Sequence, residues 1–263
     1  MQVQNKRSAD LIGVPMDFGA GHRGVDLGPA AIRHARLLSR LRELGHEVRD
    51  RGDLRVPVRD NAEVGDPALR YLDSILPVLV ELSAQVQETV ARGSVPVVLG
   101  GDHSIGLGSV AGSTAVRRLG VLWVDTHGDF NTHETTPSGN IHGMPLAALC
   151  GYGHDALCTL GGTRAGPIVD PANVVIIGAR DLDAEEKRLM RDAGVTVFSM
   201  AAIDRYGIHE VMRRAMQIAS RGTDGIHLTF DLDVVDPQFA PGVGTPSAGG
   251  MPIREAHLVM EMM

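Results

Sequence analysis

The chain has 263 residues, a formal net charge of −7, 43% hydrophobic residues and only 3% aromatic residues. This length allows one α/β domain with a sizeable core, and the acidic balance with few aromatic rings excludes a basic or base-stacking surface for nucleic acid. The sequence has no long apolar run for a membrane span, no signal-peptide pattern at its start and only two cysteines, so we expect a cytoplasmic protein without membrane contact.

The first elements alternate between strand and helix. An apolar segment at residues 10–15 predicts a strand, and the leucine stripe over 30–44 predicts a helix. Between them, the glycine-rich segment 19–29 predicts a loop that either holds an anion through its backbone N–H groups or is a tight turn without a ligand. The sequence leaves these two interpretations open.

A third strand leads to the first candidate site residue. We expect a short strand over 46–51 and a long helix over 68–92, with a kink or break at Pro77 because proline removes a helical hydrogen bond. The apolar segment 96–99 predicts a buried strand followed by two glycines. His103 comes directly after them and should face the crevice at the carboxyl end of that strand.

The segment after the next strand is rich in metal-binding side chains. Residues 121–124 are apolar and predict a buried strand, and Asp125, His127 and Asp129 follow at every second position. In an extended chain, alternate side chains lie on one face, so these three could point at a common spot.

A second segment has the same form. Residues 227–230 predict another strand, and Asp231 and Asp233 follow it. Further strands are expected over 173–178 and 195–198, with helices from 184, over 208–220 and from 252. Strands that alternate with helices indicate a mainly parallel sheet, in which ligands bind at the carboxyl ends of the strands.

The candidate ligands share one chemistry. They are two imidazoles and four carboxylates: His103, Asp125, His127, Asp129, Asp231 and Asp233. Four carboxylates in one crevice repel one another unless cations lie among them, and two divalent ions would neutralise them. Mainly oxygen ligands with imidazole favour Mn²⁺ over structural zinc. Taken singly, an Asp-x-Asp at a strand end is more often a turn, and a lone histidine is more often a hydrogen-bonded core residue.

These motifs together resemble the ureohydrolase family, and within it the arginases rather than the agmatinases. The matching segments occur in the family's order at 13–16, 23–29, 100–105, 125–131, 138–143, 231–233 and 242–246. The resemblance implies a three-layer αβα fold around a mainly parallel sheet and a site with two Mn²⁺ ions per subunit. It also implies hydrolysis of L-arginine to L-ornithine and urea by attack of a metal-bridging hydroxide on the guanidinium carbon.

The resemblance also implies roles for single residues. The six candidate ligands match the family's metal ligands, and Asp129 counts among the catalytic residues as well. His142 matches the proton shuttle, a role that suits a group with a pKa near neutrality; from the sequence alone it is equally a solvated histidine at the start of a helix.

Residues in two loops match the substrate-binding positions of the family. Asn131, Ser138 and Asn140 correspond to the region that binds the α-carboxylate, which agmatine lacks; the alternative is a solvated loop. Asp183 and Glu186 correspond to the acids near the α-amino group. For Glu186 we favour the alternative of a residue at a helix start. Thr245 lies in a turn that lines the site.

The chain departs from the family pattern in two places. Thr126 stands where the family usually has alanine. The family pattern continues beyond residues 254–257 with a strand and a helix, and that strand carries a glutamate that holds the guanidinium. We therefore expect residues 1–263 to form a single domain that is truncated at the C-terminus and lacks this strand and helix, with an exposed sheet edge.

Three functions remain open at this stage. The first is an arginase, which the resemblance suggests forms a homotrimer or homohexamer. The second is an agmatinase or another hydrolase of guanidino compounds. The third is a metal-binding homologue with weak or no catalysis, because the final strand is missing.

Overall fold

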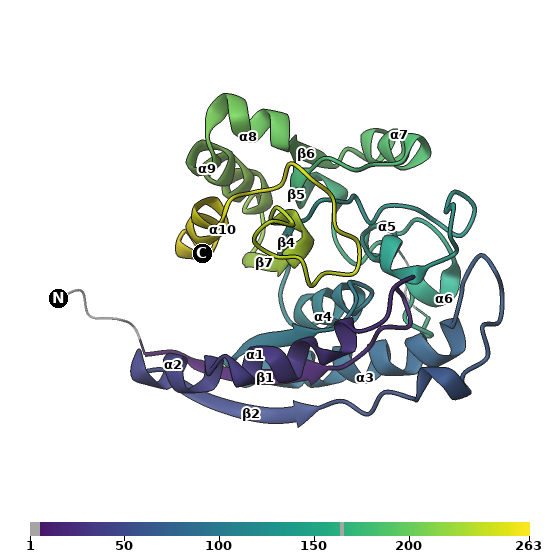
Figure 1. The fold of residues 1–263 in the computed structure, drawn as a ribbon, viewed down its shortest axis with the longest axis horizontal. Coiled ribbons are helices and arrows are strands. Elements are labelled where there is room, and N and C mark those ends of the chain that lie inside the picture. Colours follow the sequence, from purple (N-terminus) through teal and green to yellow (C-terminus); the bar gives the residue numbers. More distant parts are fainter. Residues whose placement is uncertain (1–5, 164–165) are drawn as a thin grey trace.

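Two parallel sheets form the centre of the protein. The computed structural model describes residues 6–163 and 166–263. One sheet has the strand order β2-β1-β3 and the other the order β6-β5-β4-β7, and all the strand pairs are parallel. The strands are β1 (Ser8–Val14), β2 (Glu47–Asp53), β3 (Val95–Gly100), β4 (Leu119–Val124), β5 (Val174–Ala179), β6 (Thr196–Ser199) and β7 (Gly225–Phe230). In Figure 1 the elements β1, β2, α1 and α2 lie below β4 to β7.

Helices connect the strands and cover the sheets. They are α1 (Gly28–His34), α2 (Leu37–Glu43), α3 (Leu72–Ala91), α4 (Ile105–Thr114), α5 (Pro145–Leu149), α6 (Asp155–Cys158), α7 (Ala184–Ala193), α8 (Met200–Tyr206), α9 (Ile208–Ala219) and α10 (Ile253–Glu261). Short 3₁₀ turns are η1 (Val25–Leu27), η2 (Arg59–Asn61), η3 (Ile141–Gly143), η4 (Pro171–Asn173) and η5 (Leu232–Val234). In the described parts of the chain, no helix has the length and apolar character needed to cross a membrane.

The central strands are buried on both faces. In β4, Val121 and Trp123 belong to one hydrophobic core together with residues of α3 and α4. Leu122 and Val124 belong to a second core together with residues of α9 and α10. This alternation follows the period of two along a strand, and helices on both sides give the three-layer α/β arrangement that the sequence predicted.

Two predicted helices differ from the structure. The helix expected over 30–44 is divided into α1 and α2, because Arg36 adopts a left-handed conformation with φ of 68°. Conversely, α3 runs unbroken through Pro77, so the predicted break is wrong. Pro77 lies in the second turn of α3, where it removes a single hydrogen bond and the burial of the later turns compensates.

The two sheets face each other through their inner edges, β3 and β7. A cavity of about 880 Å³ lies between these strands, and Met260 and Met263 also line it; we call it the inter-sheet cleft. In β5 every residue is buried, whereas β3 and β7 have one buried residue each, Leu99 and Thr229. In the described residues, the free edges of β3 and β7 pair with no further strand and form two walls of this cleft.

Candidate metal centre

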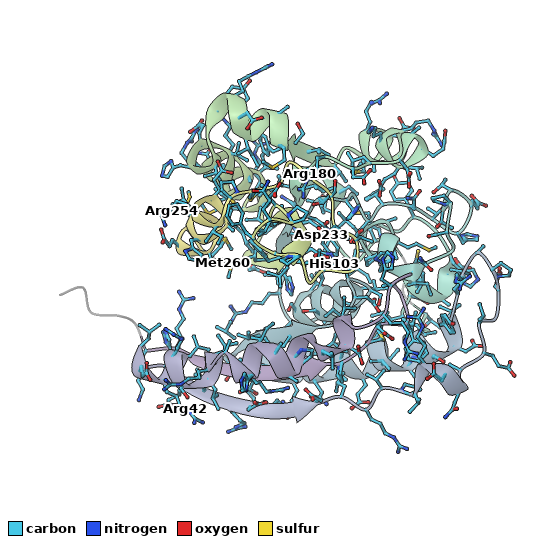
Figure 2. All side chains as sticks on the ribbon, viewed as in Figure 1. Arg42, His103, Arg180, Asp233, Arg254 and Met260 are labelled. Atoms are coloured by element: carbon cyan, nitrogen blue, oxygen red, sulfur yellow. The ribbon has the colours of Figure 1, made fainter. Side chains whose placement is uncertain are left out.

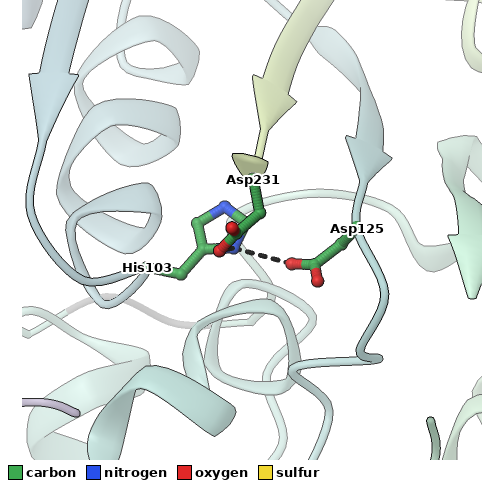
Figure 3. Close-up of side chains that lie close together, drawn as sticks. All are labelled: His103, Asp125 and Asp231. Atoms are coloured by element: carbon green, nitrogen blue, oxygen red, sulfur yellow. Dashed lines mark hydrogen bonds and ion pairs between the residues drawn. The ribbon is translucent and has the colours of Figure 1, made fainter. Parts of the chain in front are cut away.

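Side chains from three strand ends meet above the sheets. His103 follows β3, Asp125 follows β4 and Asp231 follows β7, as Figure 3 shows. The His103 Nδ1 atom lies 2.7 Å from Asp125 Oδ2 and 3.3 Å from Asp231 Oδ2. One imidazole nitrogen therefore contacts carboxylates that are far apart in the sequence.

A second group of ligands lies beside the first. His127 Nδ1 is 3.1 Å from Asp233 Oδ2 and 3.5 Å from Asp125 Oδ1. Potential ligand atoms lie within 4.8 Å of one another in each of two triads, His103–Asp125–Asp231 and Asp125–His127–Asp233. Asp125 belongs to both triads, so its carboxylate is placed to bridge two ions.

The same local turn places the ligands at both strand ends. The Oδ1 atom of Asp125 accepts a hydrogen bond of 2.8 Å from the backbone N–H of His127. The Oδ1 atom of Asp231 accepts one of 2.9 Å from the N–H of Asp233. The short side chain of Asp favours a turn in which it accepts from the N–H two residues later in the chain. The ligand side chains therefore converge because the backbone bends, and not because it continues as the extended strand that we assumed.

Asp129 lies next to both triads but in neither of them. Its Oδ2 atom is 3.0 Å from His103 Nδ1, and it is buried without a hydrogen-bond partner among the described residues. Its backbone has a φ of 49°, which is uncommon for a residue other than glycine. Conformations of this kind concentrate at functional sites, and the unpartnered oxygen is free to bind a cation.

Burial and close charges shift the pKa values of the whole cluster. Burial opposes protonation of His103 and His127, but close contacts with Asp125 and the neighbouring aspartates outweigh it. The pKa of His103 is raised well above its usual value and that of His127 to about 11. Burial also raises the pKa of Asp129, and together with the Asp125 charge it raises the pKa of Asp233 to about 6. Burial alone would raise the pKa of Asp125, but His103 and His127 donate hydrogen bonds to it, and its pKa is lowered.

These shifts show a site that requires positive charge. The raised pKa values of His103 and His127 favour their protonated forms without metal. Metal ions could replace those protons, since a bound imidazole must be neutral. Carboxylate oxygens with two imidazoles form a donor set for Mn²⁺ or a similar divalent ion. Together with the unpartnered Asp129 oxygen, the residues present fit a pair of such ions.

The polar loop predicted to bind substrate borders the cluster. Asn131 Nδ2 donates to Asp183 Oδ2 over 2.9 Å, and Thr135 Oγ1 donates to Asn131 Oδ1 over 2.9 Å. Ser138 is exposed, and its hydroxyl accepts from the Asn140 N–H over 3.2 Å. The loop thus presents hydroxyl and amide groups, with Asp183 attached to it.

Glu186 has a local structural role. It is buried at the start of α7, where it accepts hydrogen bonds from the backbone N–H groups of Phe130, at 2.8 Å, and Asp183, at 3.2 Å. The contact with Asp183 is that of a capping box. Burial raises the pKa of Glu186 to about 7 in spite of these bonds, and the geometry favours our helix-start interpretation over a contact with substrate.

The structure places the two remaining predicted residues around the cluster. Thr245 Oγ1 donates to Asp233 Oδ2 over 3.0 Å. His142 lines the inter-sheet cleft near its upper end, and burial lowers its pKa against the opposing charge of Asp102. The backbone N–H of His142 donates to Gly19 O over 3.2 Å.

Two backbone N–H groups of the glycine-rich loop before α1 donate hydrogen bonds to aspartate side chains of the protein itself. The N–H of Gly19 donates to Asp102 Oδ2 over 2.9 Å, and the N–H of Gly24 donates to Asp17 Oδ2 over 3.3 Å. Acidic partners at these positions favour the tight-loop interpretation over an anion site. Asp102 is a functional neighbour that the sequence reasoning missed, although its place directly before His103 was a signal.

Comparisons with known proteins identify the family of the chain. A model described as "Arginase family" matches residues 7–263. The chain is 48% identical to the arginase of Brevibacillus brevis over 98% of this chain and 86% of the relative. The crystal structure of the arginase from Bacillus cereus has 50% identity and a TM-score of 0.91, covering 97% of this chain and 86% of its own. The native arginase of Bacillus caldovelox has 48% identity and a TM-score of 0.93, covering 98% and 86%.

Proposed function

The chain belongs to the arginase family and is a hydrolase for a guanidino substrate, and we propose that it converts L-arginine and water to L-ornithine and urea. The observation that carries this proposal is the pair of metal-binding triads that share Asp125. The names of relatives at 46–48% identity support arginine as the substrate.

The proposed cofactor is two Mn²⁺ ions per chain. His103, Asp125 and Asp231 would hold one ion, and Asp125, His127 and Asp233 the other, with Asp129 beside them. When bound, two such ions supply a Lewis acid that activates water near neutral pH and stabilises negative charge that develops in the reaction.

His142 is the proposed proton carrier. Burial, with the charges of His127 and His103, lowers the pKa of His142 although Asp102 and Asp231 oppose this. A neutral imidazole can accept a proton and pass it to the amine nitrogen that leaves as the δ-amino group of ornithine. The proton that completes this amine comes from the water consumed in the reaction.

The polar loop after β4 is the proposed selector for arginine. Asn131, Ser138 and Asn140 offer hydrogen-bond donors to an α-carboxylate, and Asp183 offers a carboxylate to an α-amino group. Agmatine lacks that carboxylate and would leave these donors without their partner. A site built to bind a polar group discriminates strongly against a substrate without it. Thr245, which donates to Asp233, is proposed to line the site beside these groups.

Urea release tests the proposal directly. The protein is incubated with Mn²⁺ and then with L-arginine or agmatine in parallel. We expect urea from arginine, and far less from agmatine. A preference for agmatine would move the chain to the second hypothesis, and tight Mn²⁺ binding without turnover of any guanidino compound would identify a non-catalytic homologue.

We further propose that residues 1–263 act as one domain, in a homotrimer or homohexamer in the cytoplasm. The two hydrophobic cores share β4 and β5, which supports a single folding unit. Sedimentation of the Mn²⁺-loaded protein would measure the number of subunits.

A further inference from the structure

Arg180 holds two distant segments through their backbones. It follows β5, and Figure 2 labels it beside Asp233. Its guanidinium donates hydrogen bonds to four carbonyl oxygens: Asp233 O at 2.8 Å, Val234 O at 3.1 Å, Ser247 O at 2.7 Å and Ala248 O at 3.2 Å. One side chain therefore joins the ligand segment after β7 to the loop that returns to α10.

The planar fork of arginine suits this arrangement. Its five N–H donors point outward in fixed directions and can bind several acceptors at once, whereas a lysine ammonium is a compact point charge. Gly250 shows how close the packing is, because a Cβ atom there would lie 2.7 Å from Arg180 Nη2 and 2.6 Å from Val234 O.

Thr126 contacts the same candidate ligand residue, Asp233. Its Oγ1 donates to Asp233 O over 2.7 Å, and its N–H donates to Asp233 Oδ1 over 3.3 Å. Its own carbonyl accepts from the N–H of Arg180 at 3.0 Å. Where the resembling family usually has alanine, this chain thus adds a hydroxyl that binds the Asp233 backbone.

We propose that Arg180 and Thr126 are positioning residues that fix Asp233 for the second metal ion. Both donate to the Asp233 carbonyl, and neither side chain belongs to a ligand triad. The inference rests on the proposed metal centre. Neither side chain bonds to Asp231 or His103 among the described residues, so the effect is selective for the ion in the Asp125–His127–Asp233 triad.

The two contributions differ in size. Loss of an outer-shell partner of a metal ligand typically costs about 10–100-fold in metal affinity. Arg180→Met leaves four carbonyl oxygens without this donor, so we expect the second ion to bind about 10–100-fold more weakly. Thr126→Ala removes one donor of two from the Asp233 carbonyl and should weaken that ion by several-fold.

Titration with Mn²⁺ followed by electron paramagnetic resonance tests the proposal. The single-ion signal reports the first site, and the exchange-coupled signal of an ion pair reports the second. We expect Arg180→Met, Arg180→Lys and Thr126→Ala to shift only the coupled signal to higher Mn²⁺. Lysine keeps the charge without the fork, so Arg180→Lys should resemble Arg180→Met.

Thr229→Ala is the matched control, since Thr229 is also a buried threonine but its hydroxyl has no hydrogen-bond partner among residues 6–163 and 166–263. Equal weakening of both ions, unchanged binding in Thr126→Ala, or wild-type behaviour of Arg180→Lys would overturn the proposal. If Arg180→Met does not fold, Thr126→Ala decides the matter. A wild-type protein that binds no ion pair would overturn the proposed metal centre as well, which separates the two failures.

Discussion

The strands β3 and β7 are close together at one end and separated along the rest of their length. At their carboxyl ends, His103 and Asp231 lie 3.3 Å apart within a buried, hydrogen-bonded cluster. Along the strands themselves lies the inter-sheet cleft of about 880 Å³. The same pair of strands thus borders both a cluster of close polar contacts and a large cavity.

This difference shows what joins the two sheets. His103 comes from the three-stranded sheet, whereas Asp125 and Asp231 come from the four-stranded one. A metal ion in that triad would therefore connect the sheets directly, while the backbone edges below it stay unpaired. We infer that metal binding and the stability of this junction are coupled.

The largest expected effect is at the shared ligand. Asp125→Ala removes a carboxylate from both triads, so we expect the loss of both Mn²⁺ ions and of urea release. The loss of affinity should exceed the approximately 10–100-fold that outer-shell changes cause. Calorimetric titration with Mn²⁺ measures it. Asp204→Asn, on the exposed side of α8, is the control, and two ions still bound to Asp125→Ala would refute the shared role.

Replacing His142, the proposed proton carrier, should separate chemistry from metal binding. For His142→Asn we expect a fall in kcat of about 10²–10⁴-fold, as is typical when a general acid or base is removed. Mn²⁺ binding should stay unchanged, because His142 is in neither triad. Steady-state kinetics and the same titration give both values. A variant with normal kcat would remove His142 from the mechanism.

Packing behind the cluster can be tested at Gly178 in β5. Its φ is 99°, and an added Cβ would collide with Val234 and lie 3.3 Å from Asp125 O. Strain and overpacking predict that Gly178→Ala lowers the free energy of unfolding by about 2–4 kcal/mol. Gly194→Ala, at φ 83° with open space around it, measures the backbone cost alone. Equal losses in urea unfolding would show that the carboxyl end is not tightly packed.

The smallest expected effect concerns the cleft. Burial lowers the pKa of His227, on β7, to about 4, against about 6.5 in an unfolded chain. Between these pH values the unfolded chain binds a proton that the folded protein does not, so stability falls as the pH drops from about 6.5 to about 4. The loss is at most about 3 kcal/mol, and smaller because the ring is partly exposed.

His227→Gln should therefore flatten the pH dependence of unfolding in this range. His209→Gln, an exposed position on α9, should leave it as in the wild type. Denaturant unfolding measures this pH dependence. If the unfolding free energy of His227→Gln falls with pH as much as that of the wild type, burial of His227 in the cleft wall does not cause the loss, and the cleft differs less from the carboxyl-end cluster.

Much of this arrangement follows from local sequence patterns. Apolar segments predicted β4 and β5, and their positions predicted which strand ends would meet, because parallel strands end at one edge of a sheet. The turns at Asp125 and Asp231 were not foreseen, since a pattern of alternate residues fits a turn as well as a strand. The left-handed Arg36 had no sequence signal, because most left-handed positions are glycine.

The role of Arg180 was also beyond the reach of sequence reasoning. Its partners are backbone carbonyls 53 to 68 residues away, and every residue type has such a carbonyl. The division into two sheets depends on which strand edges remain unpaired, which strand patterns do not specify. In the described residues, β3 and β7 are the edge strands that border the inter-sheet cleft.

The central claim is that two adjacent triads bind two Mn²⁺ ions and thereby support arginine hydrolysis. The most direct test counts bound Mn²⁺ per chain and measures urea from L-arginine in the same samples, over a range of Mn²⁺ concentrations. We predict two ions per chain, with urea release rising as the second ion binds. Urea release that is independent of Mn²⁺, or saturation at one ion per chain, would contradict the account.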